Sequence, residues 1–397
     1  PHLLLCPRLR HIAFGEGGPA RGGHSTLQFQ DAAWHTCSQR QVKTARDDEL
    51  MHLRQVLLFV LRHFSERQRT LTQGARQLAS DVRRPNGQEA CRPQRHKDVL
   101  MVELGDGTYV GRGECFPYAR YGEDIESVQK QLNSVRPEIE SGLDRQTLGR
   151  VLPPGAARNA VDCALWDLEA KRANVRVWDL AGLPAPKTVT TVYTLGVDEP
   201  AVMGERAREN CDRPRLKLKM TGDGADLERV RSIHENAPNA RLVVDANEGW
   251  SIEQYLEYAP QFKELGVEMI EQPLPSTDDE QLRGVDRPIP VCADESCHDR
   301  ATLSALVGKY DMINIKLDKT GGLTEALNLR DEALNLGLNI MVGCMIGTSL
   351  AMAPGVIVAQ DATIVDLDGP LLLAKDRAPG LIFSGSIIHP PEPSLWG

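Results

Sequence analysis

Short apolar runs recur along residues 186–370, and a polar stretch separates each run from the next. The eight runs are TTVYTLGV, RLKLKM, RLVVDAN, EMIEQP, PVCADES, DMINIKL, NIMVGCM and TIVDLDG. From the second run onward, equivalent positions lie 22 to 28 residues apart. This is the length of one strand, one helix and two short loops. The pattern predicts an α/β fold in which a parallel barrel is surrounded by helices. A doubly wound open sheet is the alternative, but the Gly-rich first turn that it needs is missing.

Residues 98–185 show a different pattern. The segment KDVLMVELGDGTYVGRGEC contains two alternating runs about a Gly-Asp-Gly turn, which predicts a β-hairpin. Residues 124–139 and 156–173 then show apolar positions at helical spacing. We therefore expect a separate α+β domain over residues 98–185, before the barrel.

Residues 1–97 differ from the rest of the chain in charge. They hold 16 Lys and Arg against 8 Asp and Glu, a net charge of +8, whereas residues 98–397 carry −17. Apart from the apolar piece RQVLLFVLRHF, they show no sustained strand or helix periodicity. We interpret residues 1–97 as a divergent or appended segment that could contribute to the α+β domain.

The composition of the whole chain narrows the function classes. A chain of 397 residues with 41% hydrophobic content can bury a large core. A net charge of −9 argues against a nucleic-acid partner. The nine scattered cysteines contain no CxxC pair, which favours a reducing cytoplasm over a disulfide framework or a zinc site.

Neither a signal peptide nor a membrane span is expected. The apolar run in PHLLLCPRLR is too short for a signal peptide. Residues 336–359 are weakly charged, but Asn339, several glycines and Pro354 interrupt them. This pattern favours a buried strand, a loop and a helix start over a membrane-spanning helix.

Three carboxylates follow successive apolar runs: Asp245, Glu271 and Asp294. In a barrel these positions lie at the C-terminal ends of the strands, where active sites are built. Carboxylates that converge there repel one another unless a cation neutralises them, and oxygen ligands suit Mg²⁺. The sequence therefore predicts a Mg²⁺ site, with helix capping or solvated loop acids as the alternative.

Three lysines also lie within apolar strand patterns: Lys217, Lys219 and Lys316. Because strand side chains alternate, Lys217 and Lys219 share one face, and Lys316 lies across the barrel if that face is the interior. An unpaired buried ammonium tends to lose its proton, so such a lysine can act as a base. Ion pairing with nearby carboxylates is the alternative, above all for Lys217.

The ordered set K-x-K, VDANEGW, IEQP, ADES, NIKLDKTGG, GCM and DLDGP closely resembles the enolase superfamily, in its muconate lactonizing enzyme subgroup. Within that subgroup the dipeptide epimerases are the nearest match, over roughly residues 98–385. The resemblance implies a (β/α)7β TIM-like barrel over residues 186–370 and an α+β capping domain over residues 98–185. It also implies that residues 371–397 form a tail that returns towards the cap.

The resemblance implies a role for each charged strand-end residue. Asp245, Glu271 and Asp294 look like ligands of one Mg²⁺ ion. Lys219 and Lys316 look like the opposed acid and base, and Lys217 looks like an electrostatic helper beside the substrate carboxylate. A proton α to a carboxylate is very weakly acidic, so its removal needs a divalent cation on the carboxylate oxygens.

Further positions match substrate contacts of the family. Asp366 and Asp368 resemble the pair that receives the α-ammonium group of a dipeptide, with helix capping as the alternative. Thr194 matches a position that contacts the substrate, and Tyr118, Arg120 and Tyr121 in PYARYGE could close over the ligand as a lid. By contrast, we expect His298 to make a polar contact or face solvent, and Cys292, Cys297 and Cys344 to pack in the core.

The expected reaction is Mg²⁺-dependent epimerisation of a dipeptide of the L-Ala-D-Glu/L-Ala-L-Glu type by 1,1-proton transfer, in the recycling of peptidoglycan peptides. An N-acylamino acid racemase or cycloisomerase of the same superfamily is one alternative, and a catalytically inactive ligand-binding barrel is another. The expected partner is a small dipeptide in the cytoplasm, with no nucleic acid and no membrane. The sequence leaves open whether the protein is a homo-oligomer.

Overall fold

The computed structural model describes residues 58–67 and 96–397, with side chains from Asp98 onward. Most of the interpretation of residues 1–97 therefore lies outside the described residues. One strand of that segment, β1 (Leu58–Arg67), is described, and the sequence pattern did not predict it.

The first sheet is antiparallel and has the order β1-β2-β3. Strands β2 (His96–Gly105) and β3 (Val110–Cys115) form the predicted hairpin. The Asp106 side chain closes their turn by accepting hydrogen bonds from the N–H groups of Thr108 and Tyr109. Strand β1 pairs with β2 along its whole length.

Helices follow this sheet, and the longest of them packs directly on it. They are α2 (Ile125–Ser134), α3 (Arg136–Glu140), α4 (Arg145–Val151), α5 (Ala156–Ala173) and α6 (Val177–Leu180). A Cβ atom on Gly113 would lie 2.1 Å from the carbonyl oxygen of Ala160 in α5, so only glycine permits this approach. Residues 98–180 thus form an α+β unit with an apolar core of its own.

Eight parallel strands follow, and neighbours in the chain are neighbours in the sheet. They are β5 (Tyr193–Leu195), β6 (Arg215–Lys219), β7 (Arg241–Asp245), β8 (Val267–Glu271), β9 (Val291–Ala293), β10 (Met312–Lys316), β11 (Asn339–Gly343) and β12 (Ile364–Asp366). Thr191 forms a parallel bridge with Val365, and the Val192 N–H donates to the Val365 carbonyl at 2.9 Å. These contacts bring the two ends of the sheet together as a barrel, so the predicted barrel is confirmed and the open-sheet alternative is wrong.

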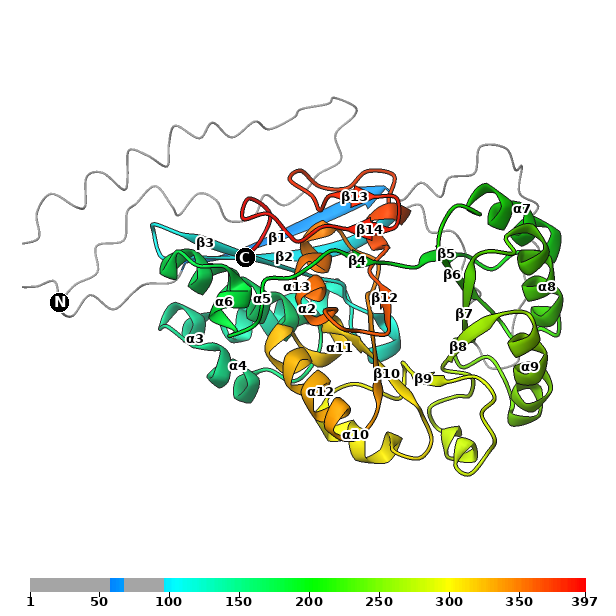
Figure 1. Ribbon diagram of the computed structural model, residues 1–397. Helices are drawn as coiled ribbons and strands as arrows, with labels where there is room; N and C mark the ends of the chain where they lie inside the picture. Colours follow the sequence, from blue (N-terminus) through cyan, green and yellow to red (C-terminus); the bar gives the residue numbers. More distant parts are fainter. Residues whose placement is uncertain (1–57, 68–95) are drawn as a thin grey trace, which may run out of the picture. The chain divides into compact units, whose positions relative to one another are not determined.

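Helices connect the barrel strands on their outer side, as Figure 1 shows for α7, α8 and α9 beside β6, β7 and β8. They are α7 (Pro200–Glu209), α8 (Asp226–Asn236), α9 (Ile252–Glu264), α10 (Arg300–Leu306), α11 (Leu317–Thr320), α12 (Leu323–Asn335) and α13 (Ser349–Val358). Between β8 and β9 the chain makes only the 3-10 turn η4 (Asp279–Leu282). The interpretation of residues 336–359 as strand, loop and helix is confirmed by β11 and α13. None of the helices in the described ranges has both the length and the apolar character needed to cross a bilayer.

The barrel interior changes from apolar to charged along the strands. One end holds a buried apolar cluster of Val192, Val243, Met269, Cys292, Met312, Met341 and Ile364. Because strand side chains alternate, the residue two positions further on faces the same interior. In β7, β8, β10 and β12 these residues are Asp245, Glu271, Asn314 and Asp366. The fold therefore places charged groups at the C-terminal ends of the strands.

The C-terminal tail runs from the barrel back to α5. Strands β13 (Phe383–Ser384) and β14 (Ile387–Ile388) form a small antiparallel sheet with β4 (Val189–Thr190). Beyond it, Trp396 Nε1 donates to the Cys163 carbonyl at 3.0 Å, and the Gly397 N–H donates to Asp167 Oδ1 at 2.8 Å.

Candidate active site

Lys217 lies at the centre of a buried cluster of carboxylates. Its Nζ atom is 2.6 Å from Glu271 Oε2, 2.7 Å from Asp366 Oδ2 and 3.1 Å from Asp245 Oδ2. The Lys217 side chain is only 2% exposed. Residues from β6, β7, β8 and β12 thus meet at one point, as the strand-end pattern predicts.

The other two lysines lie on opposite sides of this cluster. Strands β6 and β10 are four positions apart in the eight-stranded order, so they face each other across the barrel. Lys219 Nζ on β6 is 2.6 Å from Asp245 Oδ2, and Lys316 Nζ on β10 is 2.6 Å from Asp294 Oδ2. The Lys219 side chain is 31% exposed, whereas that of Lys316 is 8% exposed.

Asp245, Glu271 and Asp294 each use their second oxygen for a contact behind the site. The donors are the Asn247 N–H to Asp245 Oδ1 (3.0 Å), Asn314 Nδ2 to Glu271 Oε1 (2.6 Å) and Lys319 Nζ to Asp294 Oδ1 (2.6 Å). One oxygen of each carboxylate is therefore fixed by a hydrogen bond behind the site. The other oxygen contacts a lysine inside the barrel.

This donor set fits a hard divalent cation. Glu271 Oε2 is buried and accepts no regular hydrogen bond within the described part of the chain, although the Lys217 ammonium lies beside it. The charges of Asp245, Glu271 and Asp294 oppose one another's ionisation, and a donor set made of carboxylates favours Mg²⁺ over softer metals. Asp245, Glu271 and Asp294 are thus the residues that would hold the ion.

Burial and ion pairing shift the pKa values of these groups in opposite directions. Burial and the nearby Asp245 raise the pKa of Glu271 to about 7. Burial also opposes ionisation of Asp245 and Asp294, but the neighbouring lysines outweigh it and hold both pKa values below the usual range.

The lysines stay protonated in this arrangement. Burial alone would lower their pKa, but the adjacent carboxylates outweigh it and raise the pKa of Lys217, Lys219 and Lys316. Each of these ammonium groups is thus paired with at least one carboxylate in this state. The ion-pairing alternative applies to all three lysines.

Gln272 ties the end of β8 to the end of β9. It follows Glu271 directly and adopts a positive φ of 37°. Its Oε1 atom accepts hydrogen bonds from the N–H groups of Asp294 (2.9 Å) and Ser296 (3.2 Å), and its Nε2 atom donates to Tyr310 Oη at 2.9 Å. This buried side chain fixes the end of β9 relative to the end of β8.

A pair of aspartates, Asp366 and Asp368, lies at the end of β12. Asp366 contacts Lys217, and Asp368 Oδ2 accepts the N–H of Thr194 at 2.7 Å. Burial and the nearby Asp366 raise the pKa of Asp368 to about 7. The Sγ atom of Cys344 lies within 4.8 Å of both carboxylates. Cys344 is therefore only partly buried and packs at the margin of the core, whereas Cys292 and Cys297 are buried in the core as expected.

The cap loop that follows β3 docks on the barrel loops. Arg120 pairs with the buried carboxylate of Glu248, which belongs to the loop after β7. The Tyr121 ring lies edge-on to His298, with centroids 4.8 Å apart, and Tyr118 packs on Tyr121 at 5.4 Å. His298 therefore makes an aromatic contact, and its backbone N–H also donates to Thr302 Oγ1 at 3.2 Å, which agrees with the polar contact that we expected.

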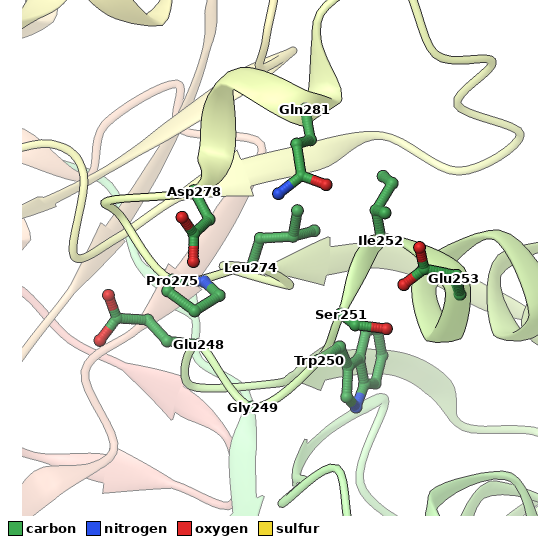
Figure 2. Close-up of a pocket in the computed structure, with 10 residues that line it drawn as sticks. All are labelled: Glu248, Gly249, Trp250, Ser251, Ile252, Glu253, Leu274, Pro275, Asp278 and Gln281. Carbon is green, nitrogen blue, oxygen red and sulfur yellow. The ribbon is translucent and has the colours of Figure 1, made fainter. Parts of the chain in front are cut away.

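A pocket of about 350 Å³ lies beside the start of α9 (Figure 2). Glu248, Trp250, Pro275 and Asp278 are among its lining residues, and none of the strand-end lysines or carboxylates lines it. It lies outside the cluster that could carry chemistry. We therefore assign the candidate active site to the strand ends.

The sequence alone did not indicate a role at the site for Asn314, Lys319 or Glu295. Asn314 and Lys319 lie within the quoted motif NIKLDKTGG, but only the structure shows which carboxylates they contact. Glu295 follows Asp294 and is buried, and this burial raises its pKa to about 8. The polar residue two positions before Lys316 in an apolar strand was the one available signal for Asn314.

Two family descriptions match the chain. The enolase C-terminal domain-like family covers residues 202–370, and the N-terminal domain of mandelate racemase/muconate lactonizing enzymes covers residues 78–182. The chain belongs to the enolase superfamily, in its mandelate racemase/muconate lactonizing enzyme group. The N-terminal match begins at residue 78, ahead of the boundary that composition suggests at residue 97.

Individual relatives of the chain include an epimerase and a racemase. The chain is 46% identical over 292 residues to L-Ala-D/L-Glu epimerase of Escherichia coli, covering 73% of this chain and 91% of that protein. It is 41% identical to N-acetyl-D-glutamate racemase of a Pseudoalteromonas species, covering 75% and 95%.

The chain is also similar to solved structures of enolase family members that are dipeptide epimerases or resemble them. One is an enolase family member from Agrobacterium tumefaciens with homology to dipeptide epimerases, bound to sodium and L-Ala-L-Glu. It has a TM-score of 0.77 and 45% identity, covering 86% of this chain and 100% of that one. Another is a dipeptide epimerase from Methylococcus capsulatus complexed with Mg and L-Arg-D-Lys, with a TM-score of 0.74, 29% identity and coverage of 85% and 98%.

Proposed function

We propose that the protein is a Mg²⁺-dependent dipeptide epimerase that interconverts L-Ala-L-Glu and L-Ala-D-Glu. The observation that carries this proposal is the placement of Lys219 and Lys316 on facing strands, with carboxylates between them. Two lysines on opposite sides can remove a proton from one face of a carbon atom and return one to the other face. The similarity to L-Ala-D/L-Glu epimerase supports the same reaction.

Each site residue has a distinct task in this proposal. Asp245, Glu271 and Asp294 would hold Mg²⁺, which would supply the positive charge that makes the α-proton of a carboxylate removable. Lys219 and Lys316 exchange roles as base and acid, because the reaction runs in both directions.

The charge state of the lysines must change for this reaction. A base must begin neutral, yet the carboxylates keep all three ammonium groups protonated in the structure. Lys217 has the most carboxylate partners and the least exposure, so it stays protonated as electrostatic support beside the substrate carboxylate. Lys219 is more exposed and has one carboxylate partner, Asp245. It is therefore better placed to lose a proton once substrate excludes water.

Asp366 and Asp368 support a substrate with an α-ammonium group. Both carboxylates are buried, and a buried negative pair favours a cation that donates hydrogen bonds to it. Thr194 contributes by orienting Asp368 through its backbone N–H. The docked cap loop, with Tyr118, Arg120 and Tyr121, would cover the bound dipeptide and exclude water.

An N-acylamino acid racemase remains the second candidate, because N-acetyl-D-glutamate racemase is a close relative. Such a substrate has no ammonium group to satisfy the acidic pair. Parallel assays of L-Ala-L-Glu and N-acetyl-L-glutamate with Mg²⁺, followed by chiral analysis of glutamate after hydrolysis, separate the two. Turnover of the N-acetyl compound alone would refute the dipeptide proposal.

We place this reaction in the cytoplasm, in the recycling of peptidoglycan peptides. The six cysteines of the described region are all free thiols, which agrees with a reducing compartment. Fractionation of cells followed by immunodetection tests the location, and recovery of the protein outside the cytoplasmic fraction would contradict it.

A further inference from the structure

Asn314 is an uncharged residue in the middle of a charged site. It lies on β10 two positions before Lys316, so both side chains face the barrel interior. The Asn314 side chain is fully buried, and its Nδ2 atom donates to Glu271 Oε1 at 2.6 Å. This is the only hydrogen bond to that Glu271 oxygen within the described residues.

The other end of the same amide has no hydrogen-bond partner in the described part of the chain. Asn314 Oδ1 is buried and accepts no hydrogen bond from any described residue. An unsatisfied buried acceptor destabilises a fold. Turning the amide over would be worse, because Oδ1 would then face the Glu271 carboxylate. The contact with Glu271 therefore sets the orientation of the side chain.

The neighbouring strand makes room for this amide. A Cβ atom on Gly343 of β11 would lie 2.6 Å from Asn314 Oδ1 and 2.8 Å from Nδ2. Gly343 is not among the glycines with positive φ, so its backbone conformation does not require glycine. The missing side chain is instead explained by the space that Asn314 occupies.

We propose that Asn314 is a positioning residue that holds Glu271 for metal binding, and that Gly343 is glycine to admit it. By fixing Oε1, the Asn314 amide leaves Oε2, which lies beside Lys217, available to the cation. Without the amide, the Glu271 carboxylate can rotate away from the other ligands. This inference rests on the proposed function, since it takes Glu271 to be a Mg²⁺ ligand.

Mg²⁺ titration calorimetry on metal-free protein tests the proposal with Asn314→Ala, Gly343→Ala and the double variant. Partners that orient a ligand typically contribute 10- to 100-fold to metal affinity, so each single variant should raise the Kd for Mg²⁺ by roughly that factor. The two substitutions act through one contact, so their effects should not multiply. The double variant should match Asn314→Ala within about twofold, because the new methyl group enters the space that the amide leaves.

Two controls separate a positioning role from a structural one. Gly149→Ala adds a methyl group where no atom lies within 4 Å of the new Cβ, and it should leave the Kd unchanged. The Tm of each metal-free variant measures the structural cost separately, because Asn314→Ala leaves Glu271 Oε1 without its donor and Gly343→Ala crowds the amide. A purely structural role would lower the Tm and leave the Kd of the folded protein unchanged. At saturating Mg²⁺, the KM for the dipeptide should also stay near the parent value.

The outcomes that overturn the proposal are distinct. If Glu271→Gln abolishes Mg²⁺ binding but Asn314→Ala leaves the Kd unchanged, the positioning role fails and the metal site stands. If Glu271→Gln binds Mg²⁺ like the parent, the proposed metal site itself fails. If the effects of Asn314→Ala and Gly343→Ala multiply, Gly343 does not act through Asn314.

Discussion

Lys217 and Lys219 share one face of β6, but their surroundings predict different responses to the same substitution. Lys217 contacts three buried carboxylates and is 2% exposed, whereas Lys219 pairs with Asp245 alone among the described carboxylates and is 31% exposed. Replacing either lysine with Met keeps much of the side-chain volume and removes the charge. The two variants therefore separate the electrostatic support of the site from its proton transfer.

The burial and the ion pairs of each lysine determine how much stability its replacement should cost. Removing one partner of a buried ion pair costs about 3–5 kcal/mol, because a charge is left buried without compensation. Lys217→Met leaves Glu271 and Asp366 in that position, whereas Asp245 keeps its pair with Lys219, so we expect a loss in this range. Lys219→Met removes one partly exposed pair, for which about 1 kcal/mol is expected. Its loss of turnover should nevertheless reach about 10²- to 10⁴-fold, the usual contribution of an acid or base.

Urea unfolding at pH 7.5 with EDTA, followed by circular dichroism, measures the first quantity, and dipeptide turnover measures the second. Lys309→Met provides a matched control. Lys309 is a buried lysine paired with Asp279, at a position away from the strand-end cluster. It should lose stability without a specific loss of proton transfer. Equal losses of stability for Lys217→Met and Lys219→Met would refute the distinction between the two lysines.

Three further predictions address the substrate, the cap and the response to pH. Asp368→Asn should raise the KM for L-Ala-L-Glu about 10- to 100-fold, because a hydrogen bond to a charged group contributes about 1.5–3 kcal/mol. The KM for N-acetyl-L-glutamate should not change, and an equal change for both substrates would contradict an ammonium site. Arg120→Gln breaks the ion pair that docks the cap loop on Glu248, so steady-state kinetics should show a several-fold higher KM for the dipeptide. An unchanged KM would exclude a role for this contact in substrate binding. Burial raises the pKa of Asp318 from 3.8 to about 7, so its ionised form destabilises the fold progressively as the pH rises from about 4 to 7. Asp318→Asn should remove this loss, and its free energy of unfolding relative to the parent should rise by up to roughly 4 kcal/mol over that range. A difference that does not vary with pH would contradict the raised pKa.

The barrel and its charged strand ends could be predicted because both depend on regular spacing. Equivalent residues recur once per strand and helix, and alternation alone turns Lys217 and Lys219 to one face. Asp245 and Glu271 needed only their position after an apolar run. These features are local in sequence, so their placement follows from periodicity once the barrel closes.

The contacts behind the site could not be predicted in the same way. Periodicity places Asn314 in the barrel interior, but its contact with Glu271 depends on the register between strands and on the space at Gly343. The charge state of the lysines likewise depends on how many carboxylates each one meets. Strand β1 was missed because the apolar piece around it shows no clear alternation, and its pairing with β2 is a long-range contact.

The central claim is that two facing lysines exchange the α-proton of the C-terminal residue of a dipeptide. Incubation of L-Ala-L-Glu with the protein and Mg²⁺ in D₂O, followed by ¹H NMR and mass spectrometry, tests it most directly. Deuterium should enter the α-position of the glutamate residue while L-Ala-D-Glu appears. Retention of the α-proton, with no D-epimer formed, would contradict proton exchange by these lysines.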